Sequence, residues 1–415
     1  MHDDAVPVTI LSGMLGAGKT TLLNHLLRHA DRDLAVLVND MGDVNVDADL
    51  VSENSEFAAG GVAELSNGCI CCELRGDLET AVVRLARERD FDHLVVEASG
   101  ISEPEPVARL FTRGSSAAAV YDVDSVVAVV DTRAFHDAFA GDGEVVRRGE
   151  GEDGTKPLSD LLVEGVEFAD LVLLNKADLV SDEELATVNE LVAALRPDAE
   201  VVVTEFSEVD PDDLLGRGLF DPTGAAERAG WRRALDADGA EEDEAHDRAH
   251  GDDHADDHDG HSHPQEAYGV TSFTYRRREP FHPGRLHEFL ASLPDSVVRS
   301  KGTLWVAGNE QRLSYSQAGP SVRVEGAGPW IASLPEVDQE LYRSNRRNVQ
   351  WDEEVGDRLA ELVFIGRGMD ESALVEALDD CLLAAAADPE AVGDDPFPSE
   401  PEAEYVVREP GAGEE

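Results

Sequence analysis

The sequence predicts an α/β fold with a mostly parallel sheet, followed by a smaller α+β domain. Short apolar runs of strand length recur through the first half of the chain, and helical patterns separate several of them. Strands that alternate with helices favour a parallel sheet that is covered by helices on both faces. A second observation divides the chain: between residues 234 and 265 the composition falls back to Asp, Glu, Gly, Ala and His, with no apolar periodicity. Such a stretch is typical of a disordered linker between two globular parts.

The expected elements of the first half are apolar, β-branched strands and the helices between them. The strands are expected at Val8–Ser12, Leu34–Asn39, Leu94–Glu97, Val126–Asp131, Leu171–Asn175 and Val201–Thr204. The helices are expected at Thr20–Arg28, Leu78–Arg89 and Glu183–Leu195. In a sheet of this kind, functional loops lie at the carboxyl ends of the strands.

Composition and pattern divide the whole chain into segments. We expect a first domain over residues 1–233, a His- and Asp-rich disordered linker over 234–265, a C-terminal α+β domain over 266–388 and an acidic disordered tail over 389–415. In the C-terminal domain, strands are expected at Val270–Tyr275, Leu304–Ala307, Ser321–Glu325 and Leu362–Ile365, and helices at Pro283–Ser292 and Glu371–Ala387.

The chain is strongly acidic. Asp and Glu number 88 against 34 Lys and Arg, which gives a formal net charge of −54. A field of this sign repels nucleic acid, because such binding depends on Lys and Arg that meet phosphates. The acidity is spread over the whole chain. We interpret it as a halophilic adaptation to high intracellular salt, where a Debye length of about 3 Å at 1 M screens the self-repulsion.

The sequence also bears on location. It contains no apolar run long enough to span a membrane. Its N-terminal residues, Met-His-Asp-Asp, are acidic and lead directly into a strand pattern, unlike a secretory signal. We therefore expect a cytoplasmic protein.

Residues 13–20, Gly-Met-Leu-Gly-Ala-Gly-Lys-Thr, fit the phosphate-loop pattern G-x-x-x-x-G-K-[ST]. The loop follows an expected buried strand and precedes a helix, so its N–H groups and the helix N-terminus can surround phosphates. We expect Lys19 to reach the β- and γ-phosphates and Thr20 to place its hydroxyl on Mg²⁺. The motif indicates a P-loop NTPase domain. The nucleotide-binding residues expected here are Gly13, Gly16, Ala17, Gly18, Lys19, Thr20 and Thr21.

An acidic residue ends the expected strand Leu94–Glu97, which is the Walker B arrangement. A carboxylate at this end of a neighbouring parallel strand lies beside the Mg²⁺ or the attacking water, so Glu97 joins Lys19 as a candidate catalytic residue. Gly100 would let the backbone approach the γ-phosphate. The acidic loop at residues 39–49 is either a switch loop that responds to the γ-phosphate or a solvated loop, and both interpretations stay open.

Residues 175–178 follow another expected strand and have the pattern N-K-x-D. The carboxylate of Asp178 can accept hydrogen bonds from N1–H and the 2-amino group of guanine. Adenine offers neither donor there, so ATP would leave a buried carboxylate unpaired. The stem of Lys176 can lie against the base or brace the phosphate loop. We therefore predict that the nucleotide is GTP and that Asn175, Lys176 and Asp178 bind it.

Residues 68–72 read Gly-Cys-Ile-Cys-Cys and place three thiols in one tight turn. Three soft thiolates suit Zn²⁺ or Cu⁺ in a tetrahedral or trigonal site. A fourth ligand would come from the switch loop, a histidine or water. The alternatives are buried small residues or a redox pair, although the spacing is not C-x-x-C. We predict a transition-metal site at Cys69, Cys71 and Cys72.

The linker contributes histidines interleaved with Asp. Imidazole and carboxylate together suit Zn²⁺, Ni²⁺ or Co²⁺ at modest affinity. A flexible acidic linker that happens to hold histidines stays an alternative. The candidate low-affinity ligands are His246, His250, His254, His258, His261 and His263. Cys381 lies in an apolar helical run and is expected to be a core residue.

The phosphate loop, the Glu-Ala-Ser-Gly run at 97–100, the N-K-x-D loop and the inserted C-x-C-C together resemble the CobW-type GTPases, which include the zinc-regulated GTPase metalloprotein activators. Residues 281–286, 299–302 with Trp305, and 362–366 are similar to the C-terminal domain of that family. The resemblance implies that the cysteines bind a metal and that GTP binding or hydrolysis controls metal transfer to a client metalloprotein. It implies zinc first, with cobalt for cobalamin synthesis as the alternative.

One motif departs from the family. Its switch loops usually read N-E-F-G-E, whereas residues 39–43 read Asn-Asp-Met-Gly-Asp. Aspartate is one methylene shorter than glutamate, so no ligand or catalytic role is carried over to Asp40 or Asp43. We expect slow intrinsic hydrolysis in which Glu97 helps to position water. Two other functions stay open: a regulatory GTPase with a structural zinc site, and a metal buffer in which GTP is incidental.

Overall fold

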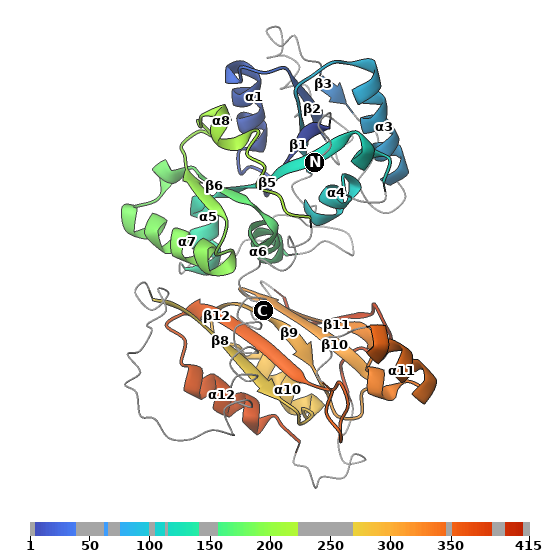
Figure 1. The fold of residues 1–415 in the computed structure, drawn as a ribbon. Helices are drawn as coiled ribbons and strands as arrows, with labels where there is room; N and C mark the ends of the chain where they lie inside the picture. The colour runs from blue at the N-terminus through green and yellow to red at the C-terminus, as the bar shows by residue number, and fades with distance from the viewer. Residues whose placement is uncertain are drawn as a thin grey trace, which may run out of the picture. The chain divides into compact units, whose positions relative to one another are not determined.

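The structure is a computed structural model that describes residues 5–38, 62–64, 75–98, 104–112, 115–140, 157–222, 269–345, 351–383 and 395–409. The chain divides into two compact units, Met1–Glu144 with Arg148–Gly230 and Val145–Arg147 with Trp231–Glu415. Each unit has its own sheet and its own core (Figure 1). Within the described residues, no helix is long and apolar enough to cross a bilayer.

The first unit holds a seven-stranded sheet in the order β3-β2-β4-β1-β5-β6-β7, and every pair of neighbours is parallel. The strands are β1 Val6–Ser12, β2 Leu34–Val38, β3 Val62–Glu64, β4 His93–Glu97, β5 Tyr121–Asp131, β6 Leu171–Asn175 and β7 Glu200–Val203. The helices are α1 Lys19–His29, α3 Arg75–Glu88, α4 Pro104–Leu110, α5 Thr132–Phe139, α6 Leu158–Phe168, α7 Asp182–Leu195 and α8 Pro211–Leu214. The predicted parallel α/β sheet is confirmed.

Both faces of this sheet are buried. Along β1, Val8 and Ile10 belong to one core cluster and Leu11 to another, because successive side chains of a strand point to opposite faces. Leu22 and Leu26 of α1 pack in the second cluster, whereas α3 and α4 contribute to the first. Burial on two faces explains why the strands are apolar without alternation. Polar chemistry is therefore concentrated at the strand ends.

β5 is longer than the sequence indicated, since it begins at Tyr121 rather than at Val126. Tyr121 is buried, and its hydroxyl donates a 2.8 Å hydrogen bond to the main-chain oxygen of Val82. Asp124 is buried as well, and its carboxylate accepts hydrogen bonds from the N–H groups of Gly216 (2.9 Å) and Gly218 (2.6 Å). These polar residues interrupt the apolar pattern, so the sequence did not indicate the first half of the strand.

The second unit holds a six-stranded sheet in the order β13-β11-β10-β9-β12-β8, with antiparallel neighbours. The strands are β8 Val270–Arg277, β9 Val297–Leu304, β10 Gln311–Ala318, β11 Ser321–Pro329, β12 Ala360–Arg367 and β13 Glu404–Arg408. The helices are α10 Pro283–Ala291, α11 Glu336–Asn345 and α12 Glu371–Asp380. One core cluster joins the sheet to α10 and α12. The predicted α+β class is confirmed, and Cys381, 5% exposed, lies in that core as expected.

Three predictions for this unit were wrong. The strand expected at Leu304–Ala307 ends at Leu304, and the chain beyond it makes only a single bridge, between Val306 and Phe281, among the described pairs. The helix expected to reach Ala387 ends at Asp380. Cys381 caps it, because the N–H of Cys381 bonds the main-chain oxygens of Leu378 and Asp379.

The third error concerns the tail, which was expected to lack structure from residue 389. Glu404–Arg408 instead form β13 and pair with β11 at the edge of the sheet. The guanidinium of Arg408 donates hydrogen bonds to the main-chain oxygens of Pro320 (2.8 Å) and Leu293 (2.9 Å). Tyr405 and Val407 also pack against the core of this unit. The apolar part of the strand is only three residues long, between Glu404 and Arg408, which is why the sequence did not indicate a strand in so acidic a tail.

Candidate nucleotide-binding site

The phosphate loop connects the end of β1 to the start of α1, and its backbone requires glycine. Gly13 has φ = 141°, and a Cβ there would lie 2.3 Å from the main-chain oxygen of Val129. Gly18 has φ = 111°, and a Cβ there would lie 2.3 Å from Nδ2 of Asn175. Any larger residue at either position would displace β5 or the Asn175 side chain. The loop is therefore closely packed on both sides while it faces the carboxyl edge of the sheet.

Lys19, the first residue of α1, lies over this loop. Its Nζ donates hydrogen bonds to the main-chain oxygens of Gly13 (2.8 Å) and Met14 (3.3 Å) and lies 4.0 Å from Oε1 of Glu97. Lys19 is 6% exposed and Glu97 5%. Glu97 is placed there because β4 pairs with β1, with Glu97 opposite Leu11. A buried cation and a buried carboxylate thus meet beside the loop, where a phosphate and its metal would need them.

Asn175 joins the end of β6 to the phosphate loop. Its Nδ2 donates hydrogen bonds to the main-chain oxygen of Ala17 (2.8 Å) and to Oγ of Ser207 (3.0 Å). Its Oδ1 accepts one from the N–H of Ser207 (2.9 Å). The Ser207 hydroxyl in turn donates to the main-chain oxygen of Gly18 (3.1 Å). Buried side chains with complete hydrogen bonding hold loops in one arrangement.

Ser207 was not predicted from the sequence. It follows β7, and it reaches the loop because β6 and β7 are parallel neighbours whose carboxyl ends lie together. A Ser shortly after the last strand is too common to serve as a signal by itself.

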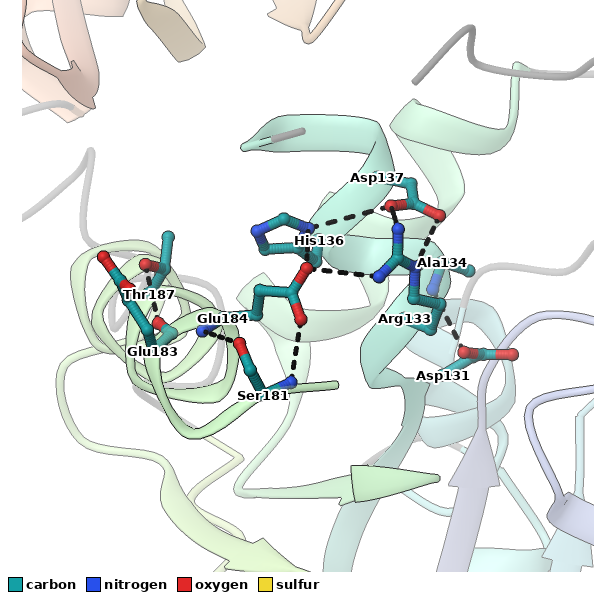
Figure 2. Close-up of polar contacts among 9 residues, drawn as sticks. All are labelled: Asp131, Arg133, Ala134, His136, Asp137, Ser181, Glu183, Glu184 and Thr187. Carbon is teal, nitrogen blue, oxygen red and sulfur yellow. Dashed lines mark hydrogen bonds and ion pairs between the residues drawn. The ribbon is translucent and has the colours of Figure 1, made fainter. Parts of the chain in front are cut away.

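Lys176 turns away from the strand with φ = 61°, and its Nζ donates a 2.6 Å hydrogen bond to Oδ2 of Asp131 at the end of β5. Asp131 also caps α5, since its Oδ1 accepts the N–H of Ala134 at 3.0 Å (Figure 2). The Thr132 hydroxyl donates to the main-chain oxygen of Asn175 (2.7 Å). Both contacts hold the N-K-x-D loop against α5. Asp178 lies in this loop and is exposed rather than buried as expected, so its carboxylate is accessible to a base.

The structure thus brings Gly18, Lys19 and Glu97 together with Asn175. Thr20 and Thr21 lie in the first turn of α1. Other predicted residues lie outside the described part of the chain and remain predictions: Gly100, residues 39–43, Cys69, Cys71, Cys72, His246, His250, His254, His258, His261 and His263. Among the residues that are described, no group of three or more His, Cys, Asp or Glu side chains could hold a metal ion.

A parallel sheet with a glycine-rich loop before α1, an acid at the end of β4 and an N-K-x-D loop after β6 defines a P-loop GTPase. The chain belongs to the CobW family. Residues 7–203 match the CobW/HypB/UreG nucleotide-binding domain, and residues 270–382 match the cobalamin synthesis protein cobW C-terminal domain.

Curated relatives extend this similarity. Zinc-regulated GTPase metalloprotein activator 1 from Dictyostelium discoideum is 35% identical over 413 residues, which cover 92% of this chain and 81% of the relative. Zinc chaperone CobW from Pseudomonas aeruginosa is 38% identical over 224 residues, which cover 51% of this chain and 60% of the relative. A crystal structure of Zn(II)-bound YjiA GTPase from E. coli shares 20% identity and a TM-score of 0.39 over 91% of this chain and 99% of that chain.

Proposed function

We propose that the chain is a GTP-dependent metallochaperone of the cytoplasm. In this proposal it binds and slowly hydrolyses GTP with Mg²⁺, holds a transition metal at Cys69, Cys71 and Cys72, and delivers that metal to a client metalloprotein. The observation that carries it is the hydrogen-bonded junction of Asn175, Ser207 and Gly18, which joins the N-K-x-D loop to the phosphate loop. The names of the relatives, a zinc-regulated GTPase metalloprotein activator and a zinc chaperone, support zinc as the metal.

The described residues fit a nucleotide with its magnesium. The main chain of residues 13–18 leaves no room for side chains at Gly13 and Gly18, as expected of a backbone that wraps phosphates. Lys19 would exchange its main-chain oxygen partners for phosphate oxygens, and Thr20 would hold Mg²⁺ through its hydroxyl. Mg²⁺, when bound, neutralises charge on the β- and γ-phosphates. Glu97, buried beside Lys19, would orient the attacking water.

The cysteines of the proposed metal site follow a strand of the same sheet in sequence. Cys69, Cys71 and Cys72 lie between β3, which ends at Glu64, and α3, which begins at Arg75. β3 continues the parallel sheet from β2, so β3 ends at the carboxyl edge, where the phosphate loop also lies. In this proposal, nucleotide state biases the metal affinity of the thiolates. The linker histidines would add low-affinity sites that raise the local metal concentration.

A competitive Zn²⁺ titration tests the proposal. Reduced full-length protein is titrated in about 1 M KCl, which screens the acidic surface, first with Mg²⁺–GDP and then with a non-hydrolysable GTP analogue. A nucleotide-dependent change in Zn²⁺ affinity of about tenfold or more, equivalent to about 1.4 kcal/mol of coupling, is expected. The change should vanish in Cys71→Ser.

Cys381→Ala is the matched control, because Cys381 is a buried thiol in the core of the second unit. It should leave Zn²⁺ affinity and its nucleotide dependence unchanged. Equal Zn²⁺ affinities in both nucleotide states would reject the gating, after which the titration is repeated with Co²⁺. Loss of the fold in Cys71→Ser, with nucleotide-independent affinity, would instead favour a regulatory GTPase with structural zinc.

A further inference from the structure

The turn after β7 contains an aromatic side chain in an unfavourable position. Phe206 is 68% exposed. Its backbone is left-handed, with φ = 54°, a conformation that is costly for a bulky L-residue. Because the ring is exposed and the backbone is left-handed, a Phe at this position does not favour folding. Residues held in such conformations cluster at binding sites, where surrounding contacts enforce them.

The neighbouring residue fixes where Phe206 lies. Ser207 is buried and also left-handed, with φ = 58°. Its N–H donates to Oδ1 of Asn175 (2.9 Å) and its hydroxyl to the main-chain oxygen of Gly18 (3.1 Å). Phe206 is therefore one residue away from the atoms that join the N-K-x-D loop to the phosphate loop.

A contact on the other side completes this placement. The N–H of Ala177 donates a 3.2 Å hydrogen bond to the main-chain oxygen of Thr204. Thr204 and Ser207 are thus both bonded to the N-K-x-D loop, and Phe206 lies between them in the chain. The main chain at Phe206 consequently lies beside the segment that carries Asp178. Main-chain and buried side-chain contacts, rather than the ring itself, maintain this turn.

We propose that Phe206 stacks on the face of the guanine base. The inference rests on the proposed guanine-nucleotide site and adds a residue to it. Asp178 would read the base through hydrogen bonds at its edge, whereas the face of a purine is a π-surface that aromatic side chains bind without regard to ring substituents. Phe206 then determines affinity for the nucleoside, and Asp178 determines which purine is accepted.

Equilibrium binding of GDP and inosine diphosphate, each with Mg²⁺, separates these roles. Hypoxanthine lacks the 2-amino group of guanine but keeps the stacking face. Phe206→Ala is expected to weaken both nucleotides by the same factor, about tenfold, and Phe206→Tyr should restore binding. Val203→Ala is the matched control, because Val203 is 50% exposed on the adjoining strand β7. It should change neither affinity.

A stability measurement distinguishes a binding role from a structural one. Phe206→Gly relieves the left-handed backbone and removes only an exposed ring, so its thermal midpoint should equal or exceed that of the wild type. GDP affinity should still fall about tenfold. A lowered midpoint in Phe206→Gly would identify a structural residue and overturn the inference.

The binding outcomes also separate this inference from the proposed function. If the wild type binds GDP tightly and Phe206→Ala binds it equally well, stacking is rejected while the guanine site stands. Failure of the wild-type chain to bind either nucleotide would reject the site and the stacking together. Weakening of GDP alone, with inosine diphosphate unaffected, would assign Phe206 to edge recognition and also overturn the stacking.

Discussion

Asn175 donates a 2.8 Å hydrogen bond from its side-chain amide to the main-chain oxygen of Ala17, which lies 158 positions earlier in the chain. The bond fastens the end of β6 to the phosphate loop. The same amide contacts Ser207 through both its nitrogen and its oxygen. In the proposed function these two loops bind the base and the phosphates, so a change that breaks their connection should reduce affinity for the whole nucleotide.

Ser207→Ala tests this junction. The change removes the hydroxyl that lies between Asn175 and Gly18 but leaves the main-chain N–H contact. Loss of a buried hydrogen-bonding group is expected to lower the free energy of unfolding by about 1–2 kcal/mol. GDP affinity should fall about fivefold, because a loosened loop must be ordered on binding. Urea denaturation and calorimetric GDP titration measure the two effects.

The control for that change is Ser292→Ala. The Ser292 hydroxyl also donates to a main-chain oxygen, that of Glu288 at 2.8 Å, but it lies at the exposed end of α10. It should alter stability by less than about 0.5 kcal/mol and leave GDP affinity unchanged. Equal effects of the two serine variants would contradict a special role for Ser207.

Asp131→Asn tests whether the brace on Lys176 matters. Asparagine still caps a helix, so α5 should persist by circular dichroism, while Lys176 loses its carboxylate partner at 2.6 Å. Affinity for GDP is expected to fall about three- to tenfold, because the N-K-x-D loop is no longer held by a charge-assisted bond. Fluorescence titration with a labelled GDP provides the measurement.

Asp137→Asn supplies the comparison on the same helix. Asp137 pairs with Arg133 at 2.7 Å, and Figure 2 shows this pair beside Glu184 of α7. Both members of the pair are more than a third exposed, and exposed ion pairs contribute little. GDP affinity should therefore stay unchanged. A drop as large as that of Asp131→Asn would point to general charge effects rather than the Lys176 brace.

Acid should destabilise the first unit through His93. Burial lowers the pKa of His93 from 6.5 to about 4, against a smaller opposite effect of Asp124. The unfolded chain takes up this proton near pH 6.5 and the folded chain only near pH 4. The contribution of His93 to the free energy of unfolding is therefore fully present above pH 6.5. It decreases by up to about 3 kcal/mol as the pH falls toward 4.

Denaturation of the wild type and of His93→Gln at pH 7.5, 6.5, 5.5 and 4.5 isolates this effect from the many carboxylates. Glutamine keeps a polar partner near Oγ of Thr9, which lies 2.8 Å from Nε2 of His93. The stability difference between the two proteins should shrink or reverse as the pH falls from 6.5 to 4.5. A constant difference over that range would show that the pKa of His93 is the same in the folded and the unfolded chain.

Salt should stabilise the whole chain. With a formal net charge of −54, self-repulsion acts over a Debye length of about 10 Å at 0.1 M and about 3 Å at 1 M. The thermal midpoint, measured by calorimetry, is therefore expected to rise steadily from 0.1 to 2 M KCl. A protein that stays folded for days in dilute buffer, without metal or nucleotide and with the same midpoint, would argue against adaptation to salt.

The phosphate loop and the N-K-x-D loop of the first unit could be predicted because each is a short motif whose residue types have local backbone and charge requirements. Gly18 is needed where Asn175 leaves no room for a side chain, and Lys19 follows at the start of a helix. Ser207 and Phe206 could not be found in this way. Their position beside the two loops depends on which strands are neighbours in space, and a local sequence pattern does not indicate the order β5-β6-β7.

The second unit was harder to predict because buried polar side chains replace apolar ones in its strands. Arg299 is 1% exposed, and its Nη1 donates to Oγ of Ser316 (2.8 Å) and to the main-chain oxygen of Gln317 (3.0 Å). Gln317, fully buried, donates to the main-chain oxygen of Val297 (3.0 Å). Such pairings bury β9 and β10 without apolar runs, so hydrophobic pattern alone could not identify them.

β13 covers the β11 edge of the sheet in the second unit. It is five residues long and ends in the charged residues Glu404 and Arg408, whereas its partner β11 has nine residues. A short charged strand is a poor template for another chain, but a long uncovered one invites edge-to-edge pairing. Proteolytic removal of the chain after Pro401 would expose the β11 edge, with Val322 and Val324 on it, and we expect the clipped protein to aggregate under conditions in which the intact chain stays dispersed.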